Sequence, residues 1–149
     1  MIYYKTGDLL KADATYICHQ VNCRGVMGAG IAKQVKDTWP EVYNDYIKAI
    51  QNHPKYCPLG EITATKINNN QVVINMFAQD RYGHGIRFTD YEAFYKCLER
   101  IKDLTNSNST IAFPHGIGCG LGGGDWEIIE TMIQNVLKDR KVYIYKYWG

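Results

Sequence analysis

Two glycine-rich stretches, each placed between an apolar run and a segment of helical character, constrain the fold of this chain more than any other feature. The first stretch covers residues 21–32, at the end of an apolar run that begins at Ala14. It leads into residues 31–39, where apolar residues recur at helical spacing. A strand, a glycine-rich turn and a helix start direct several backbone N–H groups at one point, which suits an anion such as phosphate.

A second stretch of the same kind, at residues 114–126, favours ligand binding over a simple tight connection. It follows a short β-prone run at 110–113 and has six glycines between Gly116 and Gly124, more than one turn requires. In an α/β sheet, ligands lie beyond the carboxyl ends of strands, where such loops converge. We therefore expect the two stretches to clasp a diphosphate from both sides.

The glycine spacing disfavours the two most familiar phosphate loops. Gly25, Gly28 and Gly30 do not follow the Gly-x-Gly-x-x-Gly order of a dinucleotide site, and no Gly-Lys-Ser/Thr sequence follows them. A Rossmann site and a nucleoside-triphosphatase loop are therefore not expected.

Length and composition predict one globular domain, residues 1–149. Of the 149 residues, 46% are hydrophobic and 13% aromatic, enough for a sizeable core. The 17 basic and 15 acidic residues are interspersed, so no basic stripe marks a binder of free nucleic acid. The N-terminus does not resemble a leader, and no apolar run approaches the ~18 residues that span a membrane. We expect a monomeric, cytoplasmic protein without a membrane segment.

The five cysteines predict reduced thiols. Their number is odd, and they lack Cys-x-x-Cys spacing. Cys18, His19 and Cys23 have no second pair of donors that would complete a zinc site. We expect free, mostly buried thiols, no metal and no cofactor.

The rest of the chain alternates between strand-like and helical patterns. We expect strands at residues 2–5, 14–21, 61–67, 71–78, 110–113 and 141–148, with an asparagine turn joining the third and fourth into a hairpin. Helices are expected at 31–39, from Pro40, from Thr89 and from Asp125. This order predicts an α/β fold with a mixed, largely parallel sheet flanked by helices on both faces.

Sequence signals also predict helix caps and buried faces. Thr89-Asp90-Tyr91-Glu92 matches a capping box with Thr89 as the cap, and Asp125 is placed to cap the last helix. Apolar residues at helical spacing are expected to be buried. They are Val42, Tyr43, Tyr46, Ile47 and Ile50 in the second helix, Tyr91, Phe94, Tyr95, Leu98 and Ile101 in the third, and Ile128, Ile129, Met132, Ile133, Val136 and Leu137 in the last.

Three motifs together resemble the macrodomain family, whose members bind ADP-ribose. They are Gly7-Asp8-Leu9, then Val21-Asn22-Cys23 leading into Met27-Gly28-Ala29-Gly30-Ile31-Ala32, and finally Ile117-Gly118-Cys119-Gly120-Leu121. They occur in the family's order, and the resemblance covers essentially the whole chain. It implies a three-layer α/β/α macrodomain fold.

The resemblance also implies a set of ligand-binding residues. Asp8 would recognise adenine, the first loop would hold the phosphates, Asn22 would face the distal ribose, and the second loop would cover the diphosphate. Turn chemistry alone explains Asp8 equally well as a carboxylate at a turn or helix start. The implied set is Asp8, Leu9, Gln20, Asn22, Met27, Gly28, Ala29, Gly30, Ile31, Gly118, Cys119, Gly120, Leu121, Gly122 and Gly123.

His19 and Asn22 are the candidate catalytic residues. The Asn22 amide can orient a sugar hydroxyl or a water, and it can equally satisfy loop backbone. Alternation puts His19 on the face opposite Cys18 and Gln20, where a lone histidine is more often a packed residue. Relatives similar to the yeast phosphatase acting on ADP-ribose 1″-phosphate have a histidine here, which implies proton transfer or phosphate contact. His115 is the second candidate.

The branch of the family that removes ADP-ribose from glutamate or DNA carries a lysine after the strand corresponding to residues 74–77. Here Phe77 is followed by Ala78-Gln79-Asp80-Arg81, so no lysine is in place for a covalent Schiff-base route. A clear carboxylate pair for a conventional glycosidase is also missing. The family precedent implies instead that the substrate's own diphosphate positions the water and that loop amides stabilise charge.

We therefore expect a hydrolase that binds ADP-ribose and releases a group from its distal ribose. The released group is either phosphate or a former ADP-ribosylation target, which makes ADP-ribosylated protein or DNA a possible partner. A reader that binds ADP-ribose without turnover is the alternative. The third possibility is an unrelated α/β domain with similar loops.

Overall fold

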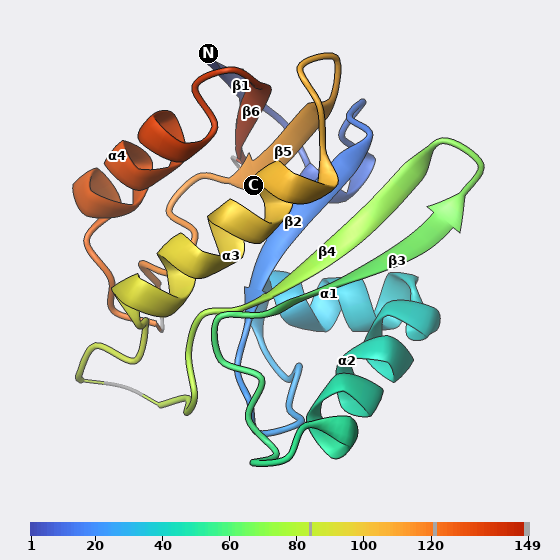
Figure 1. Cartoon of the computed structure of the whole chain (residues 1–149), viewed down its shortest axis with the longest axis vertical. Helices are drawn as coiled ribbons and strands as arrows, with labels where there is room; N and C mark the ends of the chain where they lie inside the picture. The colour runs from blue at the N-terminus through green and yellow to red at the C-terminus, as the bar shows by residue number, and fades with distance from the viewer. Residues whose placement is uncertain (84, 121, 148–149) are drawn as a thin grey trace.

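One mixed sheet organises the molecule over residues 1–83, 85–120 and 122–147, the part of the chain that the computed structural model describes (Figure 1). Six strands in this part pair in the order β1-β6-β5-β2-β4-β3. Their bounds are β1 Ile2–Thr6, β2 Tyr16–Val21, β3 Ile62–Asn68, β4 Gln71–Phe77, β5 Thr110–Pro114 and β6 Lys141–Lys146. The β3–β4 pairing is an antiparallel hairpin, as predicted, and the other pairings are parallel.

Helices connect the parallel strands. Within the described residues they are η1, a 3-10 turn at Leu9–Lys11, and the α-helices α1 Gly30–Thr38, α2 Pro40–Asn52, α3 Tyr91–Leu104 and α4 Trp126–Val136. Pro40 separates α1 from α2 because proline is accommodated at the first position of a helix and not in its interior. The prediction that one helix ends there and another begins is confirmed.

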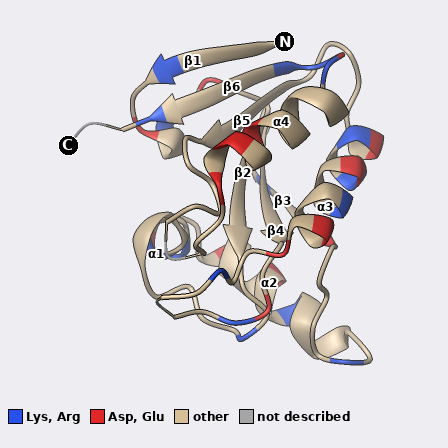
Figure 2. Ribbon diagram, turned by 90° about the vertical axis from the view of Figure 1, so that its left-hand side faces the viewer, with Lys and Arg blue, Asp and Glu red and all other residues tan. Residues whose placement is uncertain are grey.

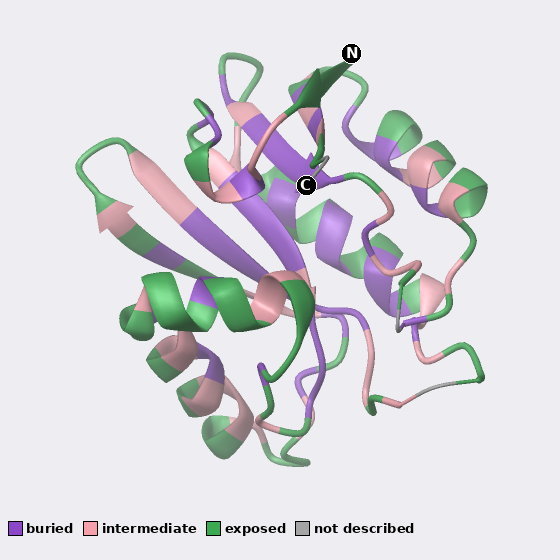
Figure 3. Ribbon diagram, turned by 180° about the vertical axis from the view of Figure 1, so that it is seen from behind, coloured by how far each residue is buried: buried purple, intermediate pink, exposed green. Residues whose placement is uncertain are grey.

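The alternation of side chains along the strands divides the core between two faces of the sheet. On one face, Cys18 of β2 packs in a cluster with Phe94 of α3 and Ile133 of α4. On the other face, Ile17 packs with Val35 of α1 and Val42 of α2. Figure 3 shows the central strands buried between these layers. The predicted α/β arrangement, with helices on both faces of a mixed sheet, is confirmed.

Charged residues lie on the outside of these layers. Acidic and basic positions alternate along the exposed side of α3, and neither sign forms a continuous stripe on that helix (Figure 2). Among the described residues, no helix combines the length and the apolar character needed to cross a membrane.

The predicted capping box at Thr89 is wrong by one residue. The cap of α3 is Asp90, whose carboxylate accepts a hydrogen bond from the Ala93 N–H at 3.0 Å. The Thr89 hydroxyl instead accepts from Gln20 Nε2 and donates to the Gly118 carbonyl at 2.6 Å, which links the helix start to the second glycine loop. The prediction for Asp125 is confirmed, since it caps α4 by accepting from the Glu127 N–H.

Two helices bury narrower faces than predicted. Tyr95 of α3 and Ile128 of α4 are each 43% exposed, because the period of the helix turns both side chains away from the buried face. In α2, Val42 and Tyr46 are buried, and Tyr43, Ile47 and Ile50 are half-buried. Some element bounds also differ from expectation: β2 begins at Tyr16, α1 begins at Gly30 and β6 ends at Lys146. Trp148, predicted to end the last strand, is outside the described residues.

Candidate functional site

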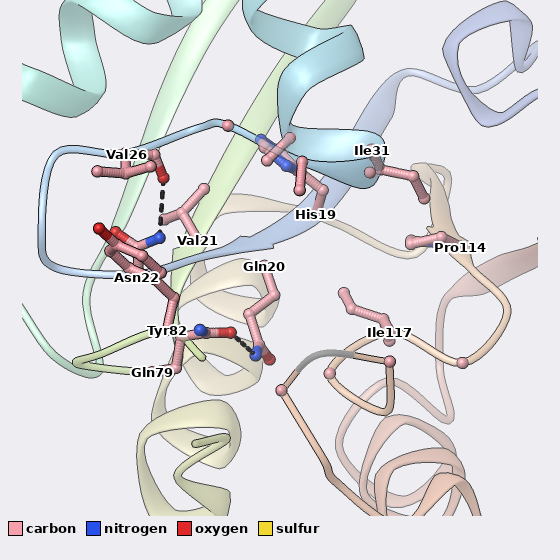
Figure 4. Close-up of a pocket in the computed structure, with 18 of the residues that line it drawn as sticks. His19, Gln20, Val21, Asn22, Val26, Ile31, Gln79, Tyr82, Pro114 and Ile117 are labelled. Carbon is pink, nitrogen blue, oxygen red and sulfur yellow. Dashed lines mark hydrogen bonds between the residues drawn. The ribbon is translucent and has the colours of Figure 1, made fainter. Parts of the chain in front are cut away.

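The two glycine-rich loops lie side by side because they follow neighbouring strands. β2 pairs in parallel with β5, so the first loop after Val21 and the second loop after Pro114 leave the sheet at the same edge. A cavity of about 530 Å³ lies between them (Figure 4). Its described lining consists of residues 19–22, 26, 28–32, 79, 82, 83, 114–118, 120 and 122.

The lining residues that the structure describes include no Asp, Glu, Lys or Arg. Attraction for an anion would therefore come from backbone dipoles. The start of α1 supplies them, because Ala29 at its cap makes no side-chain hydrogen bond to the first-turn N–H groups. Ile31, Pro114 and Ile117 add apolar surface to the wall (Figure 4). This combination suits a ligand with both phosphate and apolar parts.

Hydrogen bonds to the first loop and to Tyr46 of α2 leave the Asn22 side chain with little remaining capacity to bond a ligand. Its Oδ1 accepts from the Tyr46 hydroxyl at 2.7 Å and from the Arg24 N–H at 2.9 Å. Its Nδ2 donates to the Val26 carbonyl at 2.8 Å (Figure 4). Since the oxygen has two lone pairs and the amide has two protons, one N–H is left. Asn22 therefore organises the loop and can offer a ligand one donor.

His19 is buried, and its hydrogen bond to Asn75 sets its tautomer. The Asn75 amide nitrogen donates to the Val42 carbonyl at 3.3 Å and to the Thr63 hydroxyl at 2.9 Å, so Asn75 Oδ1 faces the imidazole. His19 Nε2 must therefore carry the proton and donate to that oxygen, at 2.5 Å. Burial lowers the pKa of His19 to about 4, and the Asn75 hydrogen bond opposes this only in part.

This assignment makes His19 Nδ1 an acceptor. Nδ1 is buried and has no hydrogen-bond partner among the described residues, although His19 lines the cavity. A neutral imidazole in this tautomer can accept a hydrogen bond from a hydroxyl or a water, but it cannot donate from Nδ1 to a phosphate. His19 also lies on the face opposite Cys18, as strand alternation predicted.

A second network connects β2 to the second loop. Gln20 Nε2 donates to Gln79 Oε1 at 2.7 Å and to Thr89 Oγ1 at 2.9 Å. The Thr89 hydroxyl donates to the Gly118 carbonyl, and the Thr89 N–H donates to the Gly122 carbonyl at 2.9 Å. Thr89 therefore holds two turns of the loop at once. The shape of the second loop therefore depends on Thr89, a residue predicted to be only a helix cap.

The structure gathers most of the predicted site residues around the cavity. His19, Gln20, Asn22, Gly28, Ala29, Gly30, Ile31, Gly118, Gly120 and Gly122 line it. Asp8, Leu9, Met27, Cys119 and Gly123 are not among the lining residues, and Leu121 is outside the described part of the chain. Met27 is buried in the core beneath the first loop. The Asp8 carboxylate caps η1 by accepting from the Leu10 N–H at 2.9 Å.

Sequence reasoning missed several lining residues. Val26 lies inside the first loop, and Gln79 and Tyr82 lie in the connector after β4. For Tyr82 the sequence did carry a signal, because it is an aromatic residue within a polar loop. In the structure it is 56% exposed and borders the cavity. His115, the second histidine candidate, also lines the cavity, and its ring packs against Trp126 at a centroid distance of 4.7 Å.

Comparison with known proteins supports the resemblance seen in the motifs. The DNA ADP-ribosyl glycohydrolase of Mycobacterium tuberculosis is 35% identical over 141 residues, which cover 89% of this chain and 38% of that protein. The ADP-ribose glycohydrolase OARD1 of Homo sapiens is 31% identical over 151 residues, covering 97% of this chain and 90% of that protein. The chain thus spans well under half the length of the mycobacterial relative.

Solved structures and a family model agree with these relatives. The macrodomain of Mycobacterium tuberculosis DarG matches with a TM-score of 0.79 and 30% identity, over 97% of both chains. The family model described as Macro domain matches residues 18–133, a range that contains both glycine-rich loops and most of the sheet. On this evidence the chain belongs to the macro domain family.

Proposed function

We propose that this chain binds ADP-ribose and hydrolyses a group from its distal ribose. The observation that carries the proposal is the cavity between two glycine-rich loops on neighbouring strands, with no charged side chain among its described lining. Such a site binds a diphosphate through backbone N–H groups and a helix start. The names of the mycobacterial and human relatives, both ADP-ribose-directed glycohydrolases, support the same substrate class.

In this proposal the ligand extends along the carboxyl edge of the sheet. The diphosphate lies between the start of α1 and the loop containing Gly118. The distal ribose approaches the free amide proton of Asn22 and the acceptor Nδ1 of His19. The adenine reaches toward Asp8, which lies just past the end of β1 at the same edge.

The proposed chemistry is attack by water without a covalent enzyme intermediate. The described lining contains no lysine, so a Schiff-base route has no nucleophile there. His19, with a pKa of about 4, is a weak base, and its contribution is to orient a water or hydroxyl by accepting its hydrogen bond. Backbone N–H groups of the loops and the substrate's diphosphate supply the remaining positioning and charge stabilisation.

Three substrates incubated in parallel test the proposal: ADP-ribose 1″-phosphate, ADP-ribosylated DNA and protein ADP-ribosylated on glutamate. Phosphorus NMR follows release of phosphate, and chromatography follows release of ADP-ribose. We expect turnover of at least one substrate and a clear loss of rate in His19→Ala. Turnover of none, together with no rise in melting temperature on adding ADP-ribose, would overturn both binding and hydrolysis.

A reader without catalytic activity is the second candidate. It is favoured by the absence of acidic and lysine side chains from the described lining and by the low basicity of His19. Its expected result is a higher melting temperature with ADP-ribose while all three modified substrates remain intact.

A further inference from the structure

Three potential metal ligands that are distant in sequence meet beside the first glycine-rich loop. Cys23 follows Asn22 in that loop, Cys57 lies in the connector between α2 and β3, and Asp80 lies in the connector after β4. The two sulfur atoms and a carboxylate oxygen of Asp80 all lie within 4.8 Å of one another. Neither thiol belongs to a disulfide.

We propose that Cys23, Cys57 and Asp80 form a Zn²⁺ site in which water supplies the fourth ligand. Two thiolates and one carboxylate are ligands that zinc accepts, with an open position completing a tetrahedron. Zn–S bonds of about 2.3 Å place two sulfurs about 3.8 Å apart in such a tetrahedron. The three atoms therefore need to approach by no more than roughly 1 Å around the ion.

The surrounding structure holds these ligands and leaves a path to them. The Cys23 N–H donates to the Asp80 carbonyl at 2.9 Å, which ties the two connectors together. Cys23 is buried, but Cys57 is half-buried and the Asp80 side chain is 46% exposed, so an ion can enter from solvent. Arg24 Nε lies 3.2 Å from Asp80 Oδ1 and orients the carboxylate from outside the ligand set.

Charge and proton balance are consistent with the site. Binding replaces two S–H bonds by two Zn–S bonds and releases two protons to solvent. Two thiolates, a carboxylate and Zn²⁺ carry a net charge of minus one, which the Arg24 guanidinium neutralises. The bound ion would join three connectors next to Asn22 and so stiffen the loop. This proposal departs from the expectation of no metal, because no spacing within the sequence brings these ligands together.

Cobalt provides a spectroscopic test, because Co²⁺ occupies thiolate sites of zinc and is coloured in tetrahedral geometry. Co²⁺ is titrated into the reduced, metal-free chain, and Zn²⁺ is then added to displace it. We expect one equivalent to produce a sulfur-to-cobalt charge-transfer band that Zn²⁺ abolishes. Saturating Zn²⁺ should also raise the melting temperature of the wild-type protein.

Substitutions of single residues test which side chains bind the metal ion. Cys57→Ser and Asp80→Asn change partly exposed residues and should weaken or abolish the cobalt band while far-ultraviolet circular dichroism stays native. Cys119→Ser is the matched control, since it removes a half-buried thiol outside the cluster and should leave the band unchanged. An unchanged band in Cys57→Ser would overturn the site, as would a wild-type protein without the band. A Cys23–Cys57 disulfide that forms on exposure to peroxide and is located by peptide mass spectrometry, with no metal bound at any stage, would overturn the metal site and identify a redox pair instead.

Discussion

The second glycine-rich loop is packed so closely that one added methyl group at Gly122 should destabilise the protein. A Cβ built on Gly122 would lie 2.5 Å from Thr89 Oγ1 and 2.8 Å from the Gly118 carbonyl oxygen. Both separations are shorter than carbon and oxygen atoms tolerate without movement. The backbone at Gly122 is not in the left-handed region, so the expected effect is steric.

The size of the effect follows from what must move. The Thr89 hydroxyl would have to leave its hydrogen bonds with Gly118 and Gln20. Overpacking costs about 1–3 kcal/mol, and each lost hydrogen bond adds about 0.5–1.5 kcal/mol. Because the loop can relax in part, we expect Gly122→Ala to lower the free energy of unfolding by about 2–4 kcal/mol. For a domain of this size, that corresponds to a drop in Tm of roughly 5–15 °C.

Gly120→Ala is the matched control in the same loop. A Cβ at Gly120 would have no atom within 4 Å, and its backbone is not in the left-handed region. Urea unfolding at pH 7 should therefore place Gly120→Ala within about 0.5 kcal/mol of the wild type. Equal stabilities for the two alanine variants would refute the packing argument.

Three further substitutions test the first loop and its supports. Gly28→Glu should abolish ADP-ribose binding in calorimetry, because it places a negative side chain where the phosphate is proposed to lie; an unchanged Kd contradicts this placement. Tyr46→Phe should lower the free energy of unfolding by about 1 kcal/mol, since it removes the hydrogen bond to Asn22 Oδ1, and urea unfolding checks the value. His19 has a pKa near 4 when folded and 6.5 when unfolded, so the unfolded state binds more protons between these values. Stability should fall by up to ~3 kcal/mol as pH decreases from 6.5 to 4, and this fall should be smaller in His19→Gln when urea midpoints are compared.

Local patterns were sufficient to predict the six strands and four α-helices of the described residues, and they missed the 3-10 turn η1. The strand-like runs, Pro40 between two helices and Asp125 at the last helix start all report interactions within a few residues of the chain. The errors arose where a distant contact competes with a local one. Thr89 has the residue type of a cap, but its hydroxyl donates a hydrogen bond to the Gly118 carbonyl of the second loop. Asp90 caps the helix instead.

The two loops of the candidate site could be predicted from the sequence. The residues of other elements that hydrogen-bond to the site could not. Both glycine-rich loops carry their signal in consecutive residues, so the sequence indicated where a ligand would bind. Tyr46, Asn75 and Thr89 carry no such signal, because each contacts the site from another part of the chain: Tyr46 and Asn75 through one hydrogen bond each, and Thr89 through three. The Tyr46 and Asn75 bonds determine which atoms of Asn22 and His19 are left for a ligand, and the Thr89 bonds shape the second loop.

By itself, the sequence determined the order of strands and helices, the positions of the two glycine-rich loops and the family resemblance. Each of these depends on side-chain periodicity or on motifs of adjacent residues. Only the tertiary structure decided that β2 and β5 are neighbours, that His19 is neutral with a free Nδ1, and that Cys23, Cys57 and Asp80 meet. These features depend on pairing between segments far apart in the chain, where burial and hydrogen bonding are set by the packed sheet and its two helical layers.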